Sequence, residues 1–235
     1  MYNFEKINNS ILTDKKVFKP NLTSKLSFNV ACKKIRNNSE VLDLGCGNGI
    51  IGIGILKNKK RIKLSCSDTS DSAYKLTKKN MSKFKLKANI KKGDLFQPWK
   101  NKKFDYIVND VSGISDLIAR KSPWFSDIVP CNTGNDGTKL TLKILSQSYK
   151  YLKPKGILQI PILSLSNEKK IFEKSKKIFK VVKVIDKVDW FLPNEMQNLY
   201  KYLENLKSRG HINFIKKFGR IICTTTIITC AIIRK

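Results

Sequence analysis

An apolar run that leads into a glycine-rich loop is the part of this sequence best suited to chemistry. It spans residues 41–49, with Asp43 two positions before the first glycine and a glycine at every second position from Gly45 to Gly49. Glycine tolerates unusual backbone angles and leaves no Cβ between a ligand and the backbone N–H groups. The aspartate adds negative charge, which suits a cationic ligand better than a phosphate. We therefore expect a nucleoside cofactor that carries positive charge.

Three more aspartates follow later predicted strands in the same way. Asp68, Asp94 and Asp110 each lie at or just past the end of a strand-like run, as Asp43 does. Parallel strands in an α/β sheet end at one edge, and ligands bind beyond that edge. Any one of these aspartates could simply cap a helix or a turn. Four of them in successive units favour a shared acidic rim.

A dinucleotide site is the first rival interpretation. Residues 47–52 match the pattern G-x-G-x-x-G, which is weak support when it stands alone. Gly47 lies two residues later than the first glycine of that pattern should, and Asp43 before it would repel a pyrophosphate. The longer pattern Asp-x-Gly-x-Gly-x-Gly therefore argues against a nicotinamide dinucleotide.

Alternating strand and helix patterns connect these motifs, which is typical of a parallel sheet covered on both faces. We place Pro161 at the end of its strand, because a central strand needs its N–H. The expected strands are residues 40–44, 63–67, 88–91, 104–108, 157–163, a run from 181, and 221–233. The expected helices are residues 22–35 (starting at Pro20 and Thr23), 49–56, 72–80, 142–152, 167–179 and 196–206.

Composition limits the class of protein. The chain has 235 residues, 47 Lys and Arg against 18 Asp and Glu, and a net charge of +29. Such a charge favours a polyanionic partner, nucleic acid or ribosome first, although a solvated basic surface is the alternative. Six cysteines without a CxxC pair and no signal peptide indicate a reduced, cytoplasmic protein. With one histidine, His211, we expect no metal site, and residues 221–233 are too short to span a bilayer.

From about residue 17 to residue 163 the chain resembles the class I, Rossmann-like methyltransferases that use S-adenosylmethionine. The resemblance implies that Asp68 holds the ribose hydroxyls, that Asp94 and Leu95 contact the adenine, and that Asn109 and Asp110 lie next to the transferable methyl group. The implied cofactor-binding residues are Asp43, Gly45, Cys46, Gly47, Asn48, Gly49, Asp68, Thr69, Asp94, Leu95 and Asn109.

Within this superfamily, one branch is more similar than the others. Residues 93–99, 104–108, 134–137 and 152–156 resemble release-factor glutamine methyltransferases and ribosomal RNA guanine methyltransferases. That branch carries Asn-Pro-Pro-Tyr or Phe after its fourth strand, where this chain has Asp110-Val111-Ser112-Gly113. Amide or exocyclic-amine methylation is therefore not implied. Ribosomal-protein lysine methyltransferases also lack the prolines, so a protein amine remains open.

The resemblance and the element order predict a doubly wound α/β fold. Its sheet would have seven mostly parallel strands, with the last strand antiparallel and a helical insertion before it. We expect residues 1–39 to form a lead-in and a helix over the cofactor site, and residues 40–235 to form the methyltransferase domain, with the insertion at 192–219.

The predicted function is methyl transfer from S-adenosylmethionine to a nitrogen acceptor on RNA or a ribosome-associated protein. Asp110 would accept a hydrogen bond from the acceptor N–H, and Asn109 is the weaker candidate. A small-molecule methyltransferase and a non-catalytic nucleic-acid-binding module are the alternatives. Acceptor recognition should come from the N-terminal segment, the loop 112–135 with Trp124 and Phe125, and the insertion 192–219. The insertion mixes basic and aromatic residues, which suits RNA, unless its Phe side chains pack on the sheet instead.

Overall fold

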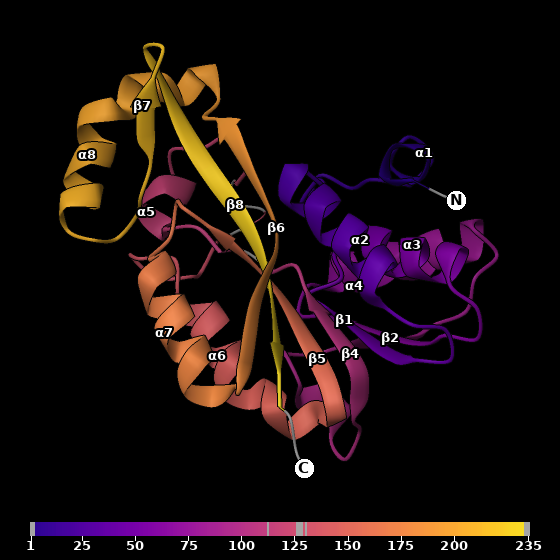
Figure 1. Cartoon of the computed structure of the whole chain (residues 1–235). Coiled ribbons are helices and arrows are strands. Elements are labelled where there is room, and N and C mark those ends of the chain that lie inside the picture. Colours follow the sequence, from indigo (N-terminus) through magenta and orange to yellow (C-terminus); the bar gives the residue numbers. More distant parts are fainter. Residues whose placement is uncertain (1–2, 112, 126–128, 130, 233–235) are drawn as a thin grey trace.

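The computed structural model describes residues 3–111, 113–125, 129 and 131–232. Within these residues, eight strands form one sheet in the order β3-β2-β1-β4-β5-β8-β6, and β7 pairs with β8 (Figure 1). The strands are β1 Glu40–Leu44, β2 Lys63–Asp68, β3 Asn89–Lys92, β4 Phe104–Asn109, β5 Leu152–Leu163, β6 Val181–Phe191, β7 Ile215–Lys217 and β8 Arg220–Ala231.

The sheet has a parallel part and an antiparallel part. Strands β1 to β5 pair in parallel, whereas β8 runs antiparallel to β5, β6 and β7. The prediction of a mostly parallel sheet with an antiparallel last strand is confirmed. Strand β7 was not predicted, because its three exposed residues give no alternation of apolar and polar side chains. The predicted end of the last strand, Ile233, lies outside the described residues.

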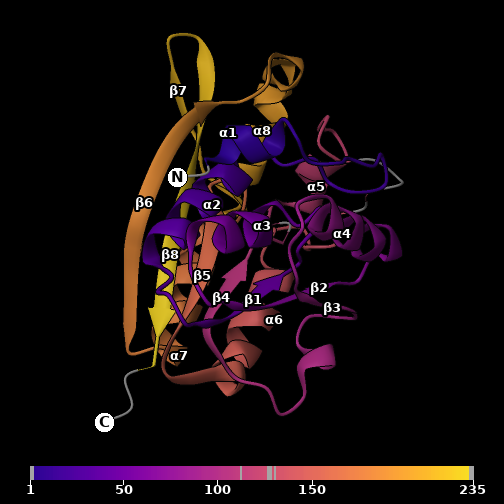
Figure 2. The same cartoon turned by 90° about the vertical axis from the view of Figure 1, so that its right-hand side faces the viewer.

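Helices cover both faces of the sheet (Figure 2). Apolar side chains of α1, α2, α3 and α4 pack on one face, and those of α6 and α7 pack on the other. The helices are α1 Phe4–Asn8, α2 Leu22–Lys34, α3 Ile50–Asn58, α4 Asp71–Lys83, α5 Asp116–Ala119, α6 Lys139–Ser148, α7 Glu168–Ile178 and α8 Tyr200–Ser208. Short 3-10 helices are η1 Gln97–Trp99, η2 Tyr149–Tyr151 and η3 Asn194–Leu199.

A third apolar cluster joins the late elements. It contains buried residues from α5, η3, α8 and the start of β8, together with Ile212 and Phe214 before β7. Phe214 is 4% exposed, so this phenylalanine of the insertion does pack inside the molecule. The cluster attaches the insertion to the sheet. None of the helices in the described part of the chain is both long and apolar enough to cross a membrane.

The predicted start of the second helix is confirmed, whereas the placement of Pro161 was wrong. Helix α2 begins after Asn21, between Pro20 and Thr23, and the Asn21 side-chain oxygen accepts hydrogen bonds from the N–H groups of Thr23 and Ser24. Pro161 lies inside β5, opposite Ile227 of β8. The ladder between β4 and β5 ends at Val108 and Gln159, so Pro161 lies beyond it and only β8 pairs with this part of β5.

Candidate functional site

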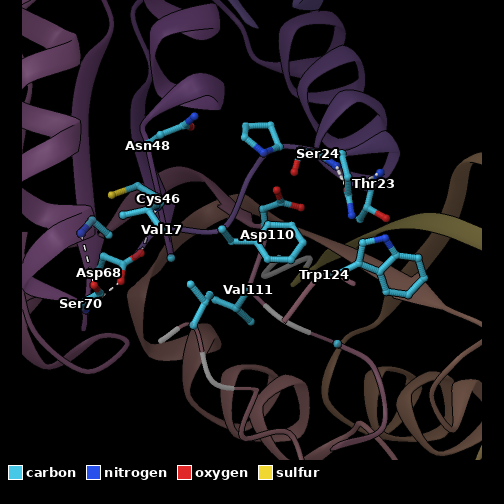
Figure 3. Close-up of a pocket in the computed structure, with 18 of the residues that line it drawn as sticks. Val17, Thr23, Ser24, Cys46, Asn48, Asp68, Ser70, Asp110, Val111 and Trp124 are labelled. Carbon is cyan, nitrogen blue, oxygen red and sulfur yellow. Dashed lines mark hydrogen bonds between the residues drawn. The ribbon is translucent and has the colours of Figure 1, made fainter. Parts of the chain in front are cut away.

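A cavity of about 900 Å³ opens at the carboxyl ends of the parallel strands. Its walls come from the segment before α2, the glycine loop after β1, and the residues that follow β2, β3 and β4 (Figure 3). The end of β6 closes the remaining side. The predicted site residues that line it are Asp43, Gly45, Cys46, Gly47, Asn48, Asp68, Thr69, Asp94, Leu95 and Asp110.

The glycine loop needs glycine for two different reasons. Gly45 has a φ of +73°, and a Cβ there would lie 2.3 Å from Cγ1 of Val111. Gly47 has a φ of +55°, but its nearest neighbour would be Cγ1 of Val17 at 4.0 Å. Backbone conformation therefore requires glycine at both positions, and close packing requires it only at Gly45. The loop backbone stays uncovered toward the cavity at Gly47.

Asp68 connects the glycine loop to the start of α4. Its carboxylate accepts the Gly47 N–H at 3.0 Å and the Ser70 N–H at 2.9 Å, with Thr69 between (Figure 3). Burial raises the pKa of this carboxyl group, while these backbone N–H groups act in the opposite direction. The side chain therefore fixes the loop while it lines the cavity.

Asp43 and Asp110 are the other two deeply placed carboxylates. Asp43 is 1% exposed and accepts the Gly52 N–H at 3.0 Å. Burial raises its pKa to about 7, and the nearby charge of Asp110 adds to the shift. Asp110 accepts a hydrogen bond from the Ser27 hydroxyl at 3.2 Å. Burial raises its pKa to about 7 as well, against the effect of the Ser24 and Ser27 hydroxyls.

The position of Asp110 is central in the site. In the close-up, its carboxylate lies between Asp68 and Cys46 on one side and Thr23 and Trp124 on the other (Figure 3). Strand β4 and the first turns of α2 together hold it there. A group in this place can contact both a ligand on the glycine loop and a second ligand near Trp124.

Two predicted residues do not line the cavity. Gly49 precedes the first turn of α3, with a φ of +85°, and a Cβ there would approach Thr77. Asn109 is 1% exposed, and its side-chain oxygen accepts the Val111 N–H at 3.3 Å. Asn109 thus orders the backbone after β4 rather than facing the cavity. Ser112, part of the same motif, lies outside the described residues.

The predicted adenine-contacting pair is partly engaged elsewhere. Asp94 forms an ion pair with Lys143 of α6 at 2.6 Å, and its side chain is 51% exposed. Leu95 is buried and has a φ of +47°. Both residues line the cavity. Asp94 therefore retains hydrogen-bonding capacity for a ligand, in competition with Lys143.

Asn48 carries a buried donor that suits a ligand. Its side chain is 3% exposed, and the side-chain oxygen accepts the Ile50 N–H at 3.2 Å. The Nδ2 atom has no hydrogen-bond partner within the described residues. A buried donor without an acceptor costs about 1–3 kcal/mol. An acceptor on a bound ligand would remove that cost.

Sequence reasoning missed Ser27 and Trp190. Ser24 and Ser27 lie three residues apart on α2 and are both buried, so this pair of hydroxyls on one helix face was the available signal. Trp190 lies near the end of β6 and meets Trp124 edge-on, with ring centroids 5.8 Å apart. Together with Phe18 and Phe125, these rings form an aromatic wall of the cavity.

The charge of the lining is the reverse of that of the whole chain. Four aspartates line the cavity, Asp43, Asp68, Asp94 and Asp110, and Lys16 is the only basic residue among the lining residues that the structure describes. The whole chain has 47 Lys and Arg against 18 Asp and Glu. Compositional bias toward lysine cannot produce this local excess of carboxylates. The site is suited to a cation.

Comparisons with known proteins agree with the resemblance seen in the sequence: part of the chain matches a methyltransferase family model, and the relatives it matches are methyltransferases. Residues 15–110 match the family model described as "Methyltransferase small domain". The chain is 31% identical over 137 residues to the release factor glutamine methyltransferase of Clostridium acetobutylicum, covering 55% of this chain and 48% of that protein. It is 33% identical over 87 residues to the ribosomal RNA small subunit methyltransferase C of Buchnera aphidicola subsp. Cinara cedri, covering 37% of this chain and 24% of the relative.

A solved structure shows the same fold. The 16S rRNA N2 G1207 methyltransferase of T. thermophilus, determined with S-adenosylmethionine and guanosine, superposes with a TM-score of 0.55 over 91% of this chain and 44% of that one, at 11% sequence identity. The chain spans about half the length of the glutamine methyltransferase that it matches, and about a quarter of the ribosomal RNA methyltransferase. The solved structure therefore shows that the fold is shared, and the substrates named for these proteins are not assigned to this chain.

Proposed function

Because this chain carries the methyltransferase small domain over residues 15–110, we propose that it transfers a methyl group from S-adenosylmethionine to a nitrogen acceptor. We propose further that the acceptor belongs to RNA or to a ribosome-associated protein, and that the reaction takes place in the cytoplasm. The acidic lining of the cavity is the observation that carries this proposal. A sulfonium is a cation, whereas the pyrophosphate of a dinucleotide would be repelled.

The residues that line the cavity fit this cofactor group by group. Asp68 would accept hydrogen bonds from the ribose hydroxyls, and Asp94 with the backbone of Leu95 would contact the adenine. The Nδ2 donor of Asn48 would serve the carboxylate of the methionine part, which would lie against the loop where Gly47 leaves open space. Each of these roles uses a group that faces the cavity or has spare hydrogen-bonding capacity.

Methyl transfer from a sulfonium requires little of the protein beyond positioning the cofactor and the acceptor and stabilising charge electrostatically. The bound cofactor supplies an electrophilic methyl group on a sulfonium. The carboxylates of Asp43 and Asp110 stabilise positive charge at the inner end of the cavity. Asp110 also accepts a hydrogen bond from the acceptor N–H, which aims the nitrogen lone pair at the methyl group. With a pKa near 7, Asp110 can hold the proton that the acceptor loses at neutral pH.

Asp110 is a better candidate for this role than Asn109. The Asn109 side chain is buried against the backbone of Val111 and is absent from the cavity lining. Asp110 lies between the glycine-loop side and the aromatic wall, where cofactor and acceptor would meet (Figure 3). We therefore narrow the catalytic assignment to Asp110, with Ser27 as a positioning residue.

Two measurements test the proposal. Calorimetric titration should show that the purified protein binds S-adenosylmethionine and its demethylated product, and that it does not bind a nicotinamide dinucleotide. Incubation with cofactor that carries a labelled methyl group and with fractionated cell extract should then label material that RNase or protease removes. Binding of the dinucleotide instead would refute the cofactor assignment. Label that resists both enzymes would replace the macromolecular acceptor with a small metabolite.

A further inference from the structure

We infer that the β7–β8 hairpin and the end of β6 bind a single-stranded segment of RNA beside the mouth of the cavity. This inference deepens the proposed function and rests on it for the link between RNA binding and methyl transfer. The residues that carry it, called here the hairpin surface, are Phe191, Tyr200, Lys216, Lys217, Phe218 and Arg220.

The hairpin extends away from the rest of the molecule. In both views β7 and the start of β8 project past the helices (Figures 1 and 2). Strand β7 has three residues, all exposed, and pairs only with β8 among the described strands. Phe218 at its tip is 81% exposed, the highest value among the large apolar side chains that are exposed in the described part of the chain. The tip adds nothing to the apolar core.

The conformation of the tip makes this exposed phenylalanine more unusual. Phe218 and Gly219 join β7 to β8 and have φ values of +52° and +71°. A two-residue hairpin turn with two positive φ angles favours Asn-Gly, and a bulky residue at positive φ is an outlier. The sequence thus keeps an aromatic ring where it is conformationally unfavourable and is not buried. Such costs persist where a side chain contacts a ligand.

Each aromatic ring of the hairpin surface has a cation beside it. Lys217 Nζ lies 5.0 Å from the centre of the Phe218 ring, and Lys216 Nζ lies 4.1 Å from that of Tyr200. The guanidinium of Arg220 lies 4.2 Å from the Phe191 ring. Each pair therefore offers a flat apolar surface next to a positive charge. A nucleotide presents the matching combination, a base that stacks and a phosphate that binds cations.

The residues around the hairpin surface also favour single-stranded RNA as its ligand. Residues 192–220 contain six Lys or Arg and two Glu. Phe191 is 46% exposed and also lines the cavity, so the hairpin surface continues into the site. An acidic peptide would use the cations without needing exposed rings, and duplex RNA would hide its bases in its own stack. A single strand uses both features and can place one base at the aromatic wall of the cavity.

The substitution Phe218→Asn tests this inference directly. It removes the ring and leaves Asn-Gly, the turn preferred for this hairpin, so β7 and β8 should stay paired. Binding of a short fluorescein-labelled oligoadenylate is measured by anisotropy at low salt, without cofactor. We expect the affinity to fall about 5- to 150-fold, as for loss of one stacked base, and Phe218→Trp to restore it. Lys217→Gln should lower the slope of log affinity against log salt by about one.

The chain offers a matched control at the opposite end of the sheet. Tyr149 is 38% exposed with Lys150 Nζ 5.8 Å from its ring, near the start of β5 and outside the cavity lining. Tyr149→Asn should leave oligoadenylate affinity unchanged. Equal loss in Tyr149→Asn and Phe218→Asn would overturn the inference, because binding would then be general electrostatics.

Cofactor titration separates this inference from the proposed function. If the wild-type protein binds S-adenosylmethionine but not oligoadenylate, the RNA surface is refuted and the methyltransferase proposal stands with another acceptor. If Phe218→Asn loses RNA affinity while the wild-type protein binds no S-adenosylmethionine, the RNA surface stands and the proposed function fails. Loss of RNA affinity with unchanged cofactor affinity supports both.

Discussion

The acidic cavity and the basic hairpin surface of this chain are suited to ligands of opposite charge. The cavity is lined by four aspartates, and burial raises the pKa values of three of them, Asp43, Asp68 and Asp110, because it disfavours their charge. The hairpin surface places lysines and an arginine in solvent beside exposed rings. Buried charges act strongly at short range, whereas exposed charges are screened by salt.

The difference separates two causes of a high net charge. A lysine-rich composition raises positive charge over the whole surface, and by itself it would indicate no particular site. At the cavity the sign is reversed, so local chemistry overrides composition there. At the hairpin the sign follows composition, and the exposed, conformationally unfavourable Phe218 is what distinguishes this surface from other lysine-rich parts. Each region can be tested against a matched position elsewhere in the chain.

The largest expected effect is that of Asp110→Ala. Loss of a group that orients the acceptor and takes up its proton should lower turnover about 10²- to 10⁴-fold. Cofactor affinity should change by no more than a few-fold. Turnover is measured by transfer of a labelled methyl group to the active extract fraction, and cofactor affinity is measured by calorimetry. Asp105→Ala, at the opposite end of β4 in a surface ion pair with Lys153, should keep full turnover. Unchanged turnover in Asp110→Ala would reject the catalytic role.

A pair of glycines compares the packing of the two regions. Gly45 and Gly219 have nearly the same φ, +73° and +71°, but a Cβ would meet Val111 at 2.3 Å in the first and nothing within 4 Å in the second. Gly219→Ala should lower the free energy of unfolding by about 1–2 kcal/mol, the cost of the left-handed conformation. Gly45→Ala should lower the free energy of unfolding by the same amount and by about 1–3 kcal/mol more, because the new methyl group overpacks the site.

Urea unfolding of both glycine variants measures this difference. The double variant Gly45→Ala/Val111→Ala should recover part of the additional loss, because the clashing methyl group is removed. Equal destabilisation of the two single variants would show that the loop after β1 is looser than its packing against Val111 indicates.

Parts of this architecture were predictable from the sequence because their causes are local. The strand β1, the loop after it and the placement of Asp68 depend on apolar runs, glycine spacing and the rule that parallel strands end at one edge. These features also placed Asp43 and Asp110 at one cavity. Short-range sequence patterns were therefore enough to predict the strands, the loop and the aspartates that frame the site.

Other features depend on partners that are distant in the sequence. Asn109 and Asp110 are adjacent at the end of β4, and successive residues of a strand point to opposite sides. The sequence favoured Asp110 on its chemistry, but which of the two side chains faces the cavity depends on the packing around them. The ion pair of Asp94 joins it to Lys143 across 49 positions. Pro161 is tolerated because of where the β4 ladder stops, and β7 exists through its pairing with β8. Tertiary contacts decide all four.

Asp68→Ala should weaken cofactor binding rather than turnover at saturation. Hydrogen bonds to a charged group contribute about 1.5–3 kcal/mol, so we expect about 10- to 100-fold lower affinity by calorimetry. Asp71→Ala, three residues later, removes a surface carboxylate that pairs with Lys75 outside the cavity and should bind normally. Because Asp68 also holds Gly47 and Ser70, thermal unfolding must accompany the titration. Normal affinity in a stably folded Asp68→Ala would remove Asp68 from the cofactor site.

The smallest effect is a dependence of cofactor affinity on pH. In the unliganded protein, the pKa values of Asp43 and Asp110 are raised to about 7, so at pH 6 both are mainly protonated. The same shifts mean that their contribution to folding is fully present below the unfolded pKa and is lost as pH rises through 7. A bound cation favours the ionised forms, so binding should release protons and strengthen from pH 6 to pH 8, by up to about tenfold for the two groups together.

Titration in two buffers with different ionisation enthalpies counts the released protons at pH 7. Asp43→Asn should lower that number, because the amide cannot ionise, while its oxygen can still accept the Gly52 N–H. The hairpin offers the contrast: oligoadenylate binding should depend steeply on salt, because lysine and arginine side chains there would contact phosphates. Proton uptake on cofactor binding, or affinity that weakens toward pH 8, would contradict the assignment of a cation to the acidic cavity.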